Sequence, residues 1–210
     1  MATFEKGILG GFSGKVGTVI GGTWKGIDYM RSKANKRTFV PSQKQLEQQA
    51  KFALLMRFLQ PLSPVLELCF NDYAIGKTGI NAAFTYNYQN AITGSYPSFS
   101  INYANALVAR GLLPGAAGPS VVAGAGGILT FSWSDNSGGD AQPTDEALLV
   151  AYCPALRQAI YGGGATRSAL TGNLNAATFS GKVVETFIAF ISEDEKNNSV
   201  SNFTGEVTVS

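Results

Sequence analysis

The sequence predicts an α+β protein in which a glycine-rich basic N-terminal hairpin and helices precede an antiparallel β-sandwich. Three observations support this fold class. Glycines recur through the first forty residues between β-type apolar segments, and residues 42–60 carry apolar positions at helical spacing. From residue 117 onward, short apolar segments alternate with turns. The same patterns divide the chain into an arm and hairpin over 1–40, a helical and mixed segment over 41–116, and a sandwich over 117–210.

The first forty residues combine many glycines with many cations. They hold eight glycines and seven Lys or Arg residues, opposed only by Glu5 and Asp28. Glycine has no side chain to bury and loses the most conformational entropy on ordering, so this segment is not expected to form a core alone. It is also too apolar and aromatic for a solvated tail. We therefore expect it to order against the rest of its chain, another copy or a polyanion.

Residues 15–31 are predicted to form a β-hairpin. Its strands, 15–20 and 23–31, flank Gly21-Gly22. Two glycines supply positive φ at both central positions of a two-residue turn, which is the most common hairpin connection. The basic loop 32–41 then ends at Pro41.

A helix is predicted to begin after Ser42. Gln45 follows three residues later, as in a capping box, and apolar positions continue at helical spacing to Phe58. The helix is expected to end before Pro61 and to cover one side of the N-terminal sheet.

Two further helices are predicted. Ser63-Pro64 provides a cap and a first-turn proline for a helix that extends to about Phe70. Asn81 is the expected cap of the next helix, which extends to about Ile92, and Gly94 is its stop signal.

The remainder of the chain reads as short β-segments. Residues 98–103 and 106–110 are short apolar stretches, and the glycines and prolines of 111–118 predict a linker. The strands expected after it are 127–134, 146–153, 158–161, 166–171, 182–192 and 199–209. Their number and spacing favour an antiparallel sandwich, with the terminal strand as an edge.

The C-terminal part resembles a fibronectin type III-like or immunoglobulin-like sandwich. The residues that carry the resemblance are 129–133, similar to the second strand with its core tryptophan, 148–152, similar to the third, 187–192, similar to the sixth, and 198–201, similar to the start of the last. The tyrosine expected near the start of the sixth strand is absent, and Val183 and Val184 occupy that region.

The whole chain is also similar to an uncharacterised family, a domain of unknown function, known mainly from Bacteroidota. The matching stretches are 13–17, 24–32, 42–52, 86–87, 93–97 and 131–137. This resemblance implies no activity. The order Gly-Lys-x-Gly, Tyr-x-Arg-Ser and a Gln-rich helix is similar to leader modules of other bacterial proteins, some from phage-like regions, which implies assembly of a particle or filament.

Charge is distributed unevenly along the chain. Residues 1–60 contain ten Lys or Arg and three Asp or Glu, a net charge of +7, whereas residues 61–210 contain six and eleven, a net charge of −5. The basic end is suited to attract the acidic part of another copy or a nucleic acid, or the two parts neutralise each other within one monomer. Only 14% of residues are charged, against about 25% in an average domain, which fits a partner-covered surface or a β protein rich in small residues.

No motif in the sequence identifies a reaction. The absence of histidine removes the most common general base and metal ligand. Gly10–Lys15 fails as a phosphate loop, because the pattern needs glycine at Leu9 and Ser or Thr at Val16. Cys69 and Cys153 lie in apolar settings and are expected to be buried free thiols. We expect no enzymatic activity, no cofactor and no metal.

Two acidic stretches remain as candidate sites. Loop 134–145 contains Asp135, Asn136, Asp140 and Asp145, whose oxygens suit calcium, but the EF-hand spacing is absent and a polar hairpin loop is favoured. Residues 193–198 are interpreted as a solvated turn or, alternatively, as an acidic partner-binding knob.

The expected function is structural. The chain is predicted to be a self-assembling subunit of a filament, shell or phage-like particle, with its N-terminal arm in head-to-tail contact with other copies. The predicted contact residues are Phe4, Ile8, Phe12, Lys15, Val19, Trp24, Lys25, Tyr29 and Arg31, with Glu193, Asp194 and Glu195 as electrostatic counterparts.

Other functions stay open from the sequence. The basic arm, with its aromatic residues, is suited to nucleic acid. The sandwich is suited to adhesion or carbohydrate binding if Tyr152, Tyr161 and Phe179 line one exposed groove, and a monomeric domain with an unknown partner is a further alternative. The sequence contains no run of about 18 apolar residues, so no membrane span is expected. The start lacks a secretory signal, so synthesis in the cytoplasm is expected, and release by a non-Sec route is left open.

Overall fold

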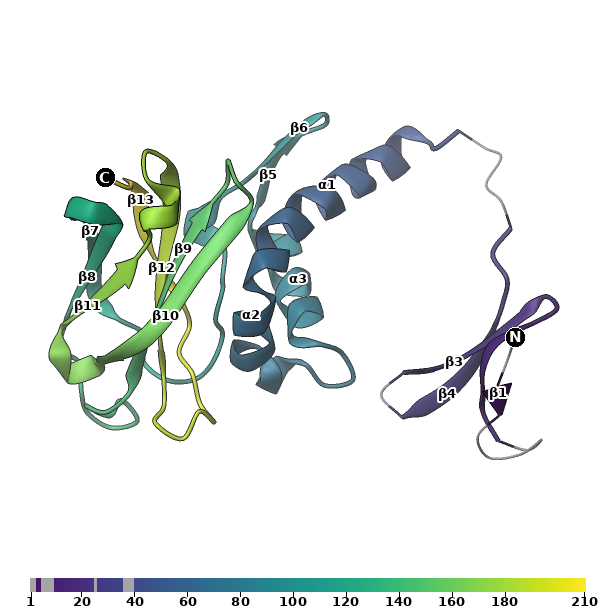
Figure 1. Cartoon of the computed structure of the whole chain (residues 1–210), viewed down its shortest axis with the longest axis horizontal. Coiled ribbons are helices and arrows are strands. Elements are labelled where there is room, and N and C mark those ends of the chain that lie inside the picture. Colours follow the sequence, from purple (N-terminus) through teal and green to yellow (C-terminus); the bar gives the residue numbers. More distant parts are fainter. Residues whose placement is uncertain (1–2, 5–9, 25, 36–39) are drawn as a thin grey trace. The chain divides into compact units, whose positions relative to one another are not determined.

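The computed structural model describes residues 3–4, 10–24, 26–35 and 40–210 of the chain (Figure 1). The chain divides into two compact units, Met1–Pro41 and Ser42–Ser210. In its described residues the first unit contains β-strands and no helix, whereas the second combines helices with β-sheets.

The first unit is a four-stranded antiparallel sheet in the order β1-β2-β3-β4. Its strands are β1 (Thr3–Phe4), β2 (Phe12–Val16), β3 (Val19–Trp24) and β4 (Ile27–Ser32). The hairpin turn predicted at Gly21-Gly22 is wrong. Both glycines lie inside β3, opposite Met30 and Tyr29, while Gly17 and Gly26 supply the positive φ values, 58° and 79°, where the chain reverses.

Helix α1 (Gln43–Leu59) begins as predicted, at a capping box. The Gln45 amide donates to Ser42 Oγ at 3.4 Å, and the Ser42 amide donates to Gln45 Oε1 at 2.9 Å. The helix ends before Pro61, as expected. Its buried side chains, Leu55, Phe58 and Leu59, lie in the core of the second unit, where the helix packs against α3 and the sandwich. That this helix also covers the N-terminal sheet stays a prediction.

The next two helices differ from their predicted caps. Helix α2 (Ser63–Cys69) continues from α1 through a 3-10 turn, so the chain is already helical at Leu62 and Ser63 caps nothing. Helix α3 (Gly79–Asn90) is capped by Thr78, whose Oγ1 accepts from the Asn81 amide at 3.3 Å, and not by Asn81 itself. Gly94 lies in β5 (Ile92–Ser95), which pairs with β6 (Ser98–Ile101).

The sandwich consists of a three-stranded sheet in the order β11-β8-β7 and a four-stranded sheet in the order β10-β9-β12-β13 (Figure 1). The strands are β7 (Ala117–Ala123), β8 (Ile128–Ser134), β9 (Glu146–Cys153), β10 (Gln158–Thr166), β11 (Thr171–Asn175), β12 (Val183–Ile191) and β13 (Asn202–Thr208). Short 3-10 helices occupy Gln60–Leu62, Asn71–Tyr73, Tyr103–Asn105, Ala125–Gly127, Arg167–Ala169 and Ala177–Phe179.

This topology is that of a fibronectin type III-like sandwich. The first, second and fifth strands of the sandwich form one sheet, and the other four form the second. The predicted second, third and sixth strands are β8, β9 and β12, and the core tryptophan, Trp133, lies buried on β8. The terminal strand β13 is an edge, as predicted.

Three β-segments were predicted incorrectly. Residues 106–110 form an irregular connection whose apolar character reflects burial of Ala106, Val108 and Ala109. Residues 166–171 contain a 3-10 turn, and the strand is β11 beyond it. Strand β7 was missed because it starts within the glycine- and proline-rich stretch interpreted as a linker.

The second unit has three layers. The outer face of β9 and β12, with Val150, Tyr152 and Phe187, packs on the helices. The opposite face of the same strands, with Leu149 and Phe190, packs on the three-stranded sheet. Central strands buried on both faces need continuous apolar runs, which explains the sequences Leu148–Tyr152 and Phe187–Ile191.

One helical run among the described residues, Gln43–Cys69, is long and apolar enough to cross a membrane by length and composition alone. Its most apolar part is the stretch that supplies Leu55, Phe58, Leu62 and Leu66 to the core, and this packing accounts for its composition. The absence of a membrane span therefore stays a prediction.

Arg167 is fully buried at one end of the sandwich core. Its guanidinium pairs with Asp145 at 3.1 Å, donates to Asn136 Oδ1 at 2.7 Å and to the Pro114 carbonyl at 2.9 Å, and lies 3.8 Å from the Phe190 ring centre. The Trp133 indole donates to the Arg167 carbonyl at 2.7 Å. One side chain thus connects the two sheets and the connection before β7.

Replacing Arg167 by Met should lower the free energy of unfolding by about 3–5 kcal/mol, because the Asp145 carboxylate would be left buried without its partner. Urea unfolding monitored by circular dichroism measures this loss. The exposed Lys182→Met change is the control and should cost under about 0.5 kcal/mol. Equal stability of the two variants would contradict the role assigned to Arg167.

Candidate functional site

The register of the first unit assigns its side chains to two faces. Residues that lie directly opposite each other on neighbouring strands share a face of the sheet. One face, here called the aromatic face, therefore carries Lys15, Ile20, Gly22, Trp24, Ile27, Tyr29 and Arg31. The opposite face, here called the aliphatic face, carries the alternate residues Phe12, Val16, Val19, Thr23, Asp28 and Met30.

Gly21 and Gly22 leave space for an aromatic ring to pack against the backbone, one on each face of the sheet. A Cβ added at Gly21 would meet the Phe12 carbonyl oxygen and would lie 2.7 Å from carbons of the Phe12 ring. A Cβ added at Gly22 would lie 3.1 Å from the Tyr29 hydroxyl oxygen, because the Tyr29 ring lies over this glycine. A cross-strand aromatic that covers a glycine restores side-chain contact to a weak position. The glycines are therefore packing positions, and their absence from the turn has a physical reason.

The first unit has apolar side chains on its surface rather than in a core. Trp24 is 53% exposed, Ile27 70% and Met30 72%, and Val16, Val19 and Tyr29 are also exposed. Every buried hydrophobic residue in the described part of the chain belongs to the second unit. The described part of this sheet therefore exposes large apolar side chains on both faces.

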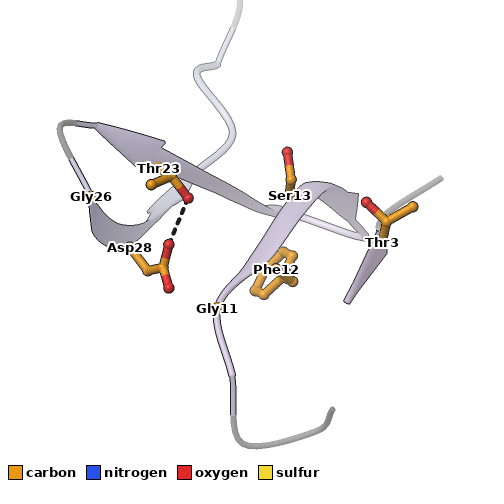
Figure 2. A pocket seen from close by; sticks show the side chains of 7 residues that line it. All are labelled: Thr3, Gly11, Phe12, Ser13, Thr23, Gly26 and Asp28. Carbon is orange, nitrogen blue, oxygen red and sulfur yellow. Dashed lines mark hydrogen bonds between the residues drawn. The ribbon is translucent and has the colours of Figure 1, made fainter. Parts of the chain in front are cut away.

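A shallow hollow lies at the end of this sheet (Figure 2). It is lined by Thr3, Gly11, Phe12, Ser13, Thr23, Gly26 and Asp28. The Thr23 hydroxyl donates to Asp28 Oδ1 at 2.6 Å across the strand pair, as Figure 2 shows. This bond fixes the carboxylate close to Gly11, where any side chain on residue 11 would collide with it.

The predicted contact residues fall into three groups. Lys15, Trp24, Tyr29 and Arg31 share the aromatic face, whereas Phe12 and Val19 lie on the aliphatic face. Phe4 belongs to β1, and Ile8 and Lys25 lie outside the described residues. Sequence reasoning missed Ile20, Ile27 and Met30, which alternation along β3 and β4 identifies once the turn is placed at Gly26.

The acidic counterparts lie in the turn between β12 and β13. Asp194 is held locally, since it accepts from Ser192 Oγ at 2.7 Å and forms an exposed ion pair with Lys196 at 3.1 Å. The hydrogen bond from Ser192 has the largest effect on the pKa of Asp194, and together with the hydrogen bonds from Lys196 it lowers that pKa to about 2. Glu193 and Glu195 are exposed beside it. Asp194 therefore shapes the turn, and the two glutamates present the charge.

The other candidate residues, those of the proposed calcium loop and the two cysteines, lie in the second unit. Asp145 and Asn136, from the proposed calcium loop, hold Arg167, and the described residues contain no group of three acidic or sulfur ligands suited to a metal. Cys69 and Cys153 are buried and free, as predicted, and burial raises the pKa of Cys69 to about 12. Neither side chain is placed for nucleophilic chemistry.

The aromatic groove required for a carbohydrate site is not formed by the predicted trio. Tyr152 and Phe179 are buried, and only Tyr161 is substantially exposed. Tyr152 instead contacts the Phe58 ring at 5.1 Å between centroids. The sequence could not distinguish these roles, because each aromatic lies in an apolar strand or turn.

Glu185 is the most perturbed carboxyl in the sandwich. It lies directly opposite Glu206 on β13, and burial, followed by repulsion from Glu206, raises the pKa of Glu185 to about 7. Since the charged form is disfavoured in the folded protein, this group contributes stability below pH 4.5 that is lost as the pH rises through 7. It is a pH-sensitive feature of the sheet.

The chain belongs to a family of unknown function (DUF6266), whose sequence pattern matches residues 11–205. The match includes strands of both units. No curated protein matches the chain. Among solved structures, the chain is similar to the solution structure of the fn3 domain of the human collagen alpha-1(XX) chain, with 10% identity and a TM-score of 0.35 over 46% of this chain and 85% of that chain.

Replacing Gly21 by Ala should disrupt the first unit, because the new methyl group would meet the Phe12 backbone, and overpacking of this kind costs about 1–3 kcal/mol. Hydrogen exchange of peptides covering residues 12–32 should accelerate, while that of β9 and β12 stays unchanged. Thr18→Ala, at an exposed turn position, is the control. Unchanged protection in the Gly21→Ala variant would show that the glycine is not a packing position.

Proposed function

We propose that this member of the family of unknown function (DUF6266) is a structural, self-assembling subunit, of a filament, shell or phage-like particle, whose first unit makes head-to-tail contacts with other copies. One observation carries the proposal. The first unit is an ordered sheet with large apolar side chains exposed on both faces and no buried hydrophobic residue in its described part. A sheet needs a second layer to bury its apolar face, and another copy is a source of that layer.

Charge favours a second copy as the occupant. Residues 1–41 contain seven Lys or Arg and two Asp or Glu, a net charge of +5. Residues 42–210 contain nine and twelve, a net charge of −3. Opposite charges on two units of the same chain steer one copy toward another in a head-to-tail arrangement. Glu193 and Glu195, which are exposed, are the acidic groups proposed to meet the basic sheet.

The second unit supports the same assignment because it buries a hydrophobic core of its own. Its central strands are buried on both faces, and its buried cation is paired with Asp145. In this proposal the second unit is the folded domain of the subunit, and the first unit is the sheet that contacts other copies.

Replacing Trp24 and Tyr29 together by Ser should weaken self-association at least a hundredfold, because two large half-exposed aromatics dominate such a contact. Light scattering across a concentration series measures the assembly size. Ile75→Ser with Leu112→Ser is the matched control, since both side chains are almost fully exposed apolar groups of the second unit. A full-length protein that stays monomeric at high concentration would overturn the proposal.

Nucleic-acid binding is the second candidate, favoured by one observation. The aromatic face places Lys15 and Arg31 on the same side as the exposed Trp24 and Tyr29. Cations beside exposed rings are the elements of a platform on which bases stack while phosphates are neutralised.

If this face binds single-stranded nucleic acid, Lys15→Gln with Arg31→Gln should reduce the slope of log affinity against log salt by about 1.4, since each lost phosphate contact removes about 0.7. Fluorescence anisotropy with a labelled oligonucleotide measures the slope, and the exposed Lys182→Gln change is the control. Absence of binding at low salt would remove this candidate and leave self-assembly standing.

A further inference from the structure

The outer edge of β4 carries backbone groups that have no hydrogen-bond partner among the described residues. Strand β4 lies at the end of the sheet order. Directly after it, the Lys33 amide donates to the carbonyl of Thr18, the residue before β3, at 2.7 Å, which sets the hydrogen-bonding phase of the β3–β4 pair. Backbone groups alternate in direction along an antiparallel strand, so residues 27, 29, 31 and 33 point toward β3. The amides and carbonyls of Asp28, Met30 and Ser32 consequently point outward.

We propose that this edge pairs with β4 of a second copy, antiparallel and around a twofold axis, so that two four-stranded sheets become one sheet of eight strands. The inference deepens the proposed self-assembly and rests on it. An exposed edge strand is a template for addition of another strand. Among the edges of the first unit, β4 is the long one, with six residues, all exposed, against two in β1.

Symmetry and hydrogen bonding together select one register. A twofold axis perpendicular to the sheet keeps each face continuous, so only residues of the same face oppose each other across the dyad. With Met30 opposite Met30 of the second copy, Asp28 lies opposite Ser32 and Ser32 opposite Asp28. All three outward-pointing residues of each strand then form hydrogen-bonded pairs, whereas a shift by two residues in either direction leaves one of them unpaired.

The side chains fit the same register. Tyr29 and Arg31 share the aromatic face and become opposite each other in the non-hydrogen-bonded pairs, where side chains approach most closely. A guanidinium next to a tyrosine ring in this position forms a cation–π contact, twice per dimer. On the aliphatic face, the Ser32 hydroxyl of one copy is placed to donate to the Asp28 carboxylate of the other. No like charges face each other in the register.

A proline at position 30 tests the pairing without removing hydrogen bonds of the subunit itself. The Met30 amide points outward, and proline is tolerated in edge strands at such positions. Met30→Pro should abolish dimerisation through β4, while Met30→Ala, which keeps the amide, should retain it. Light scattering measures the size of both variants, and hydrogen exchange of residues 12–24 confirms that the sheet persists.

Cysteine cross-linking gives an independent readout on the full-length chain. Met30→Cys should form a disulfide-linked dimer on oxidation, because opposed residues lie within the Cα range of a disulfide. Ile27→Cys is the matched control, being equally exposed, but its two copies would lie about 20 Å apart along the strands. The native Cys69 and Cys153 are fully buried and leave the comparison clear.

The outcomes separate this inference from the proposed function. Selective cross-linking at position 30 together with loss of the dimer in Met30→Pro supports the β4 dyad. Equal cross-linking at positions 27 and 30, with Met30→Pro still assembling, would overturn the dyad and leave self-assembly intact. A monomeric full-length chain would overturn both.

Discussion

The constraint on which this protein depends is the lack of side-chain volume in its first unit. A β-sheet is stable in water when one face is covered, since that burial supplies the free energy that offsets ordering of the backbone. Here Gly21 and Gly22 leave the middle of β3 flat, and Phe12 and Tyr29 fill those two positions from opposite faces. The rings lie one on each side, and among the described residues of this unit no hydrophobic side chain is buried.

The second unit covers both faces of its central strands with other layers of its own chain. Helices cover one face of β9 and β12, the three-stranded sheet covers the other, and Arg167 closes the end of the core through Asp145, Asn136 and the Pro114 carbonyl. A buried cation needs partners for its charge and its donors, and this one has carboxylate, amide and carbonyl partners as well as the Phe190 ring. The core of this unit is therefore formed by its own residues.

The sequence predicted the second unit better than the first, and the reasons can be identified. The capping box at Ser42 and the continuous apolar runs of β9 and β12 are strong local signals, and they placed α1 and the central strands correctly. Gly21-Gly22 carried a signal equally compatible with a turn or a strand, and the deciding contact, an aromatic ring from another strand, is not local. Arg167 had no sequence signal at all, because its partners come from residues 114, 136 and 145. Four of the predicted contact residues, Lys15, Trp24, Tyr29 and Arg31, share one face. Trp24 and Tyr29 do so because the turn lies between them, at Gly26, whereas within one continuous strand 23–31 they would alternate to opposite faces.

The face contact and the edge contact proposed for the first unit would produce different symmetries. Pairing of β4 with itself is isologous and closes after two copies, so by itself it yields only a dimer. Contact between a face of that sheet and the acidic turn of another copy is heterologous and leaves a matching surface open at each end. If both are used, the twofold edge contact doubles the adhesive sheet and the heterologous contact extends it, so dimers become the repeating units of a polymer.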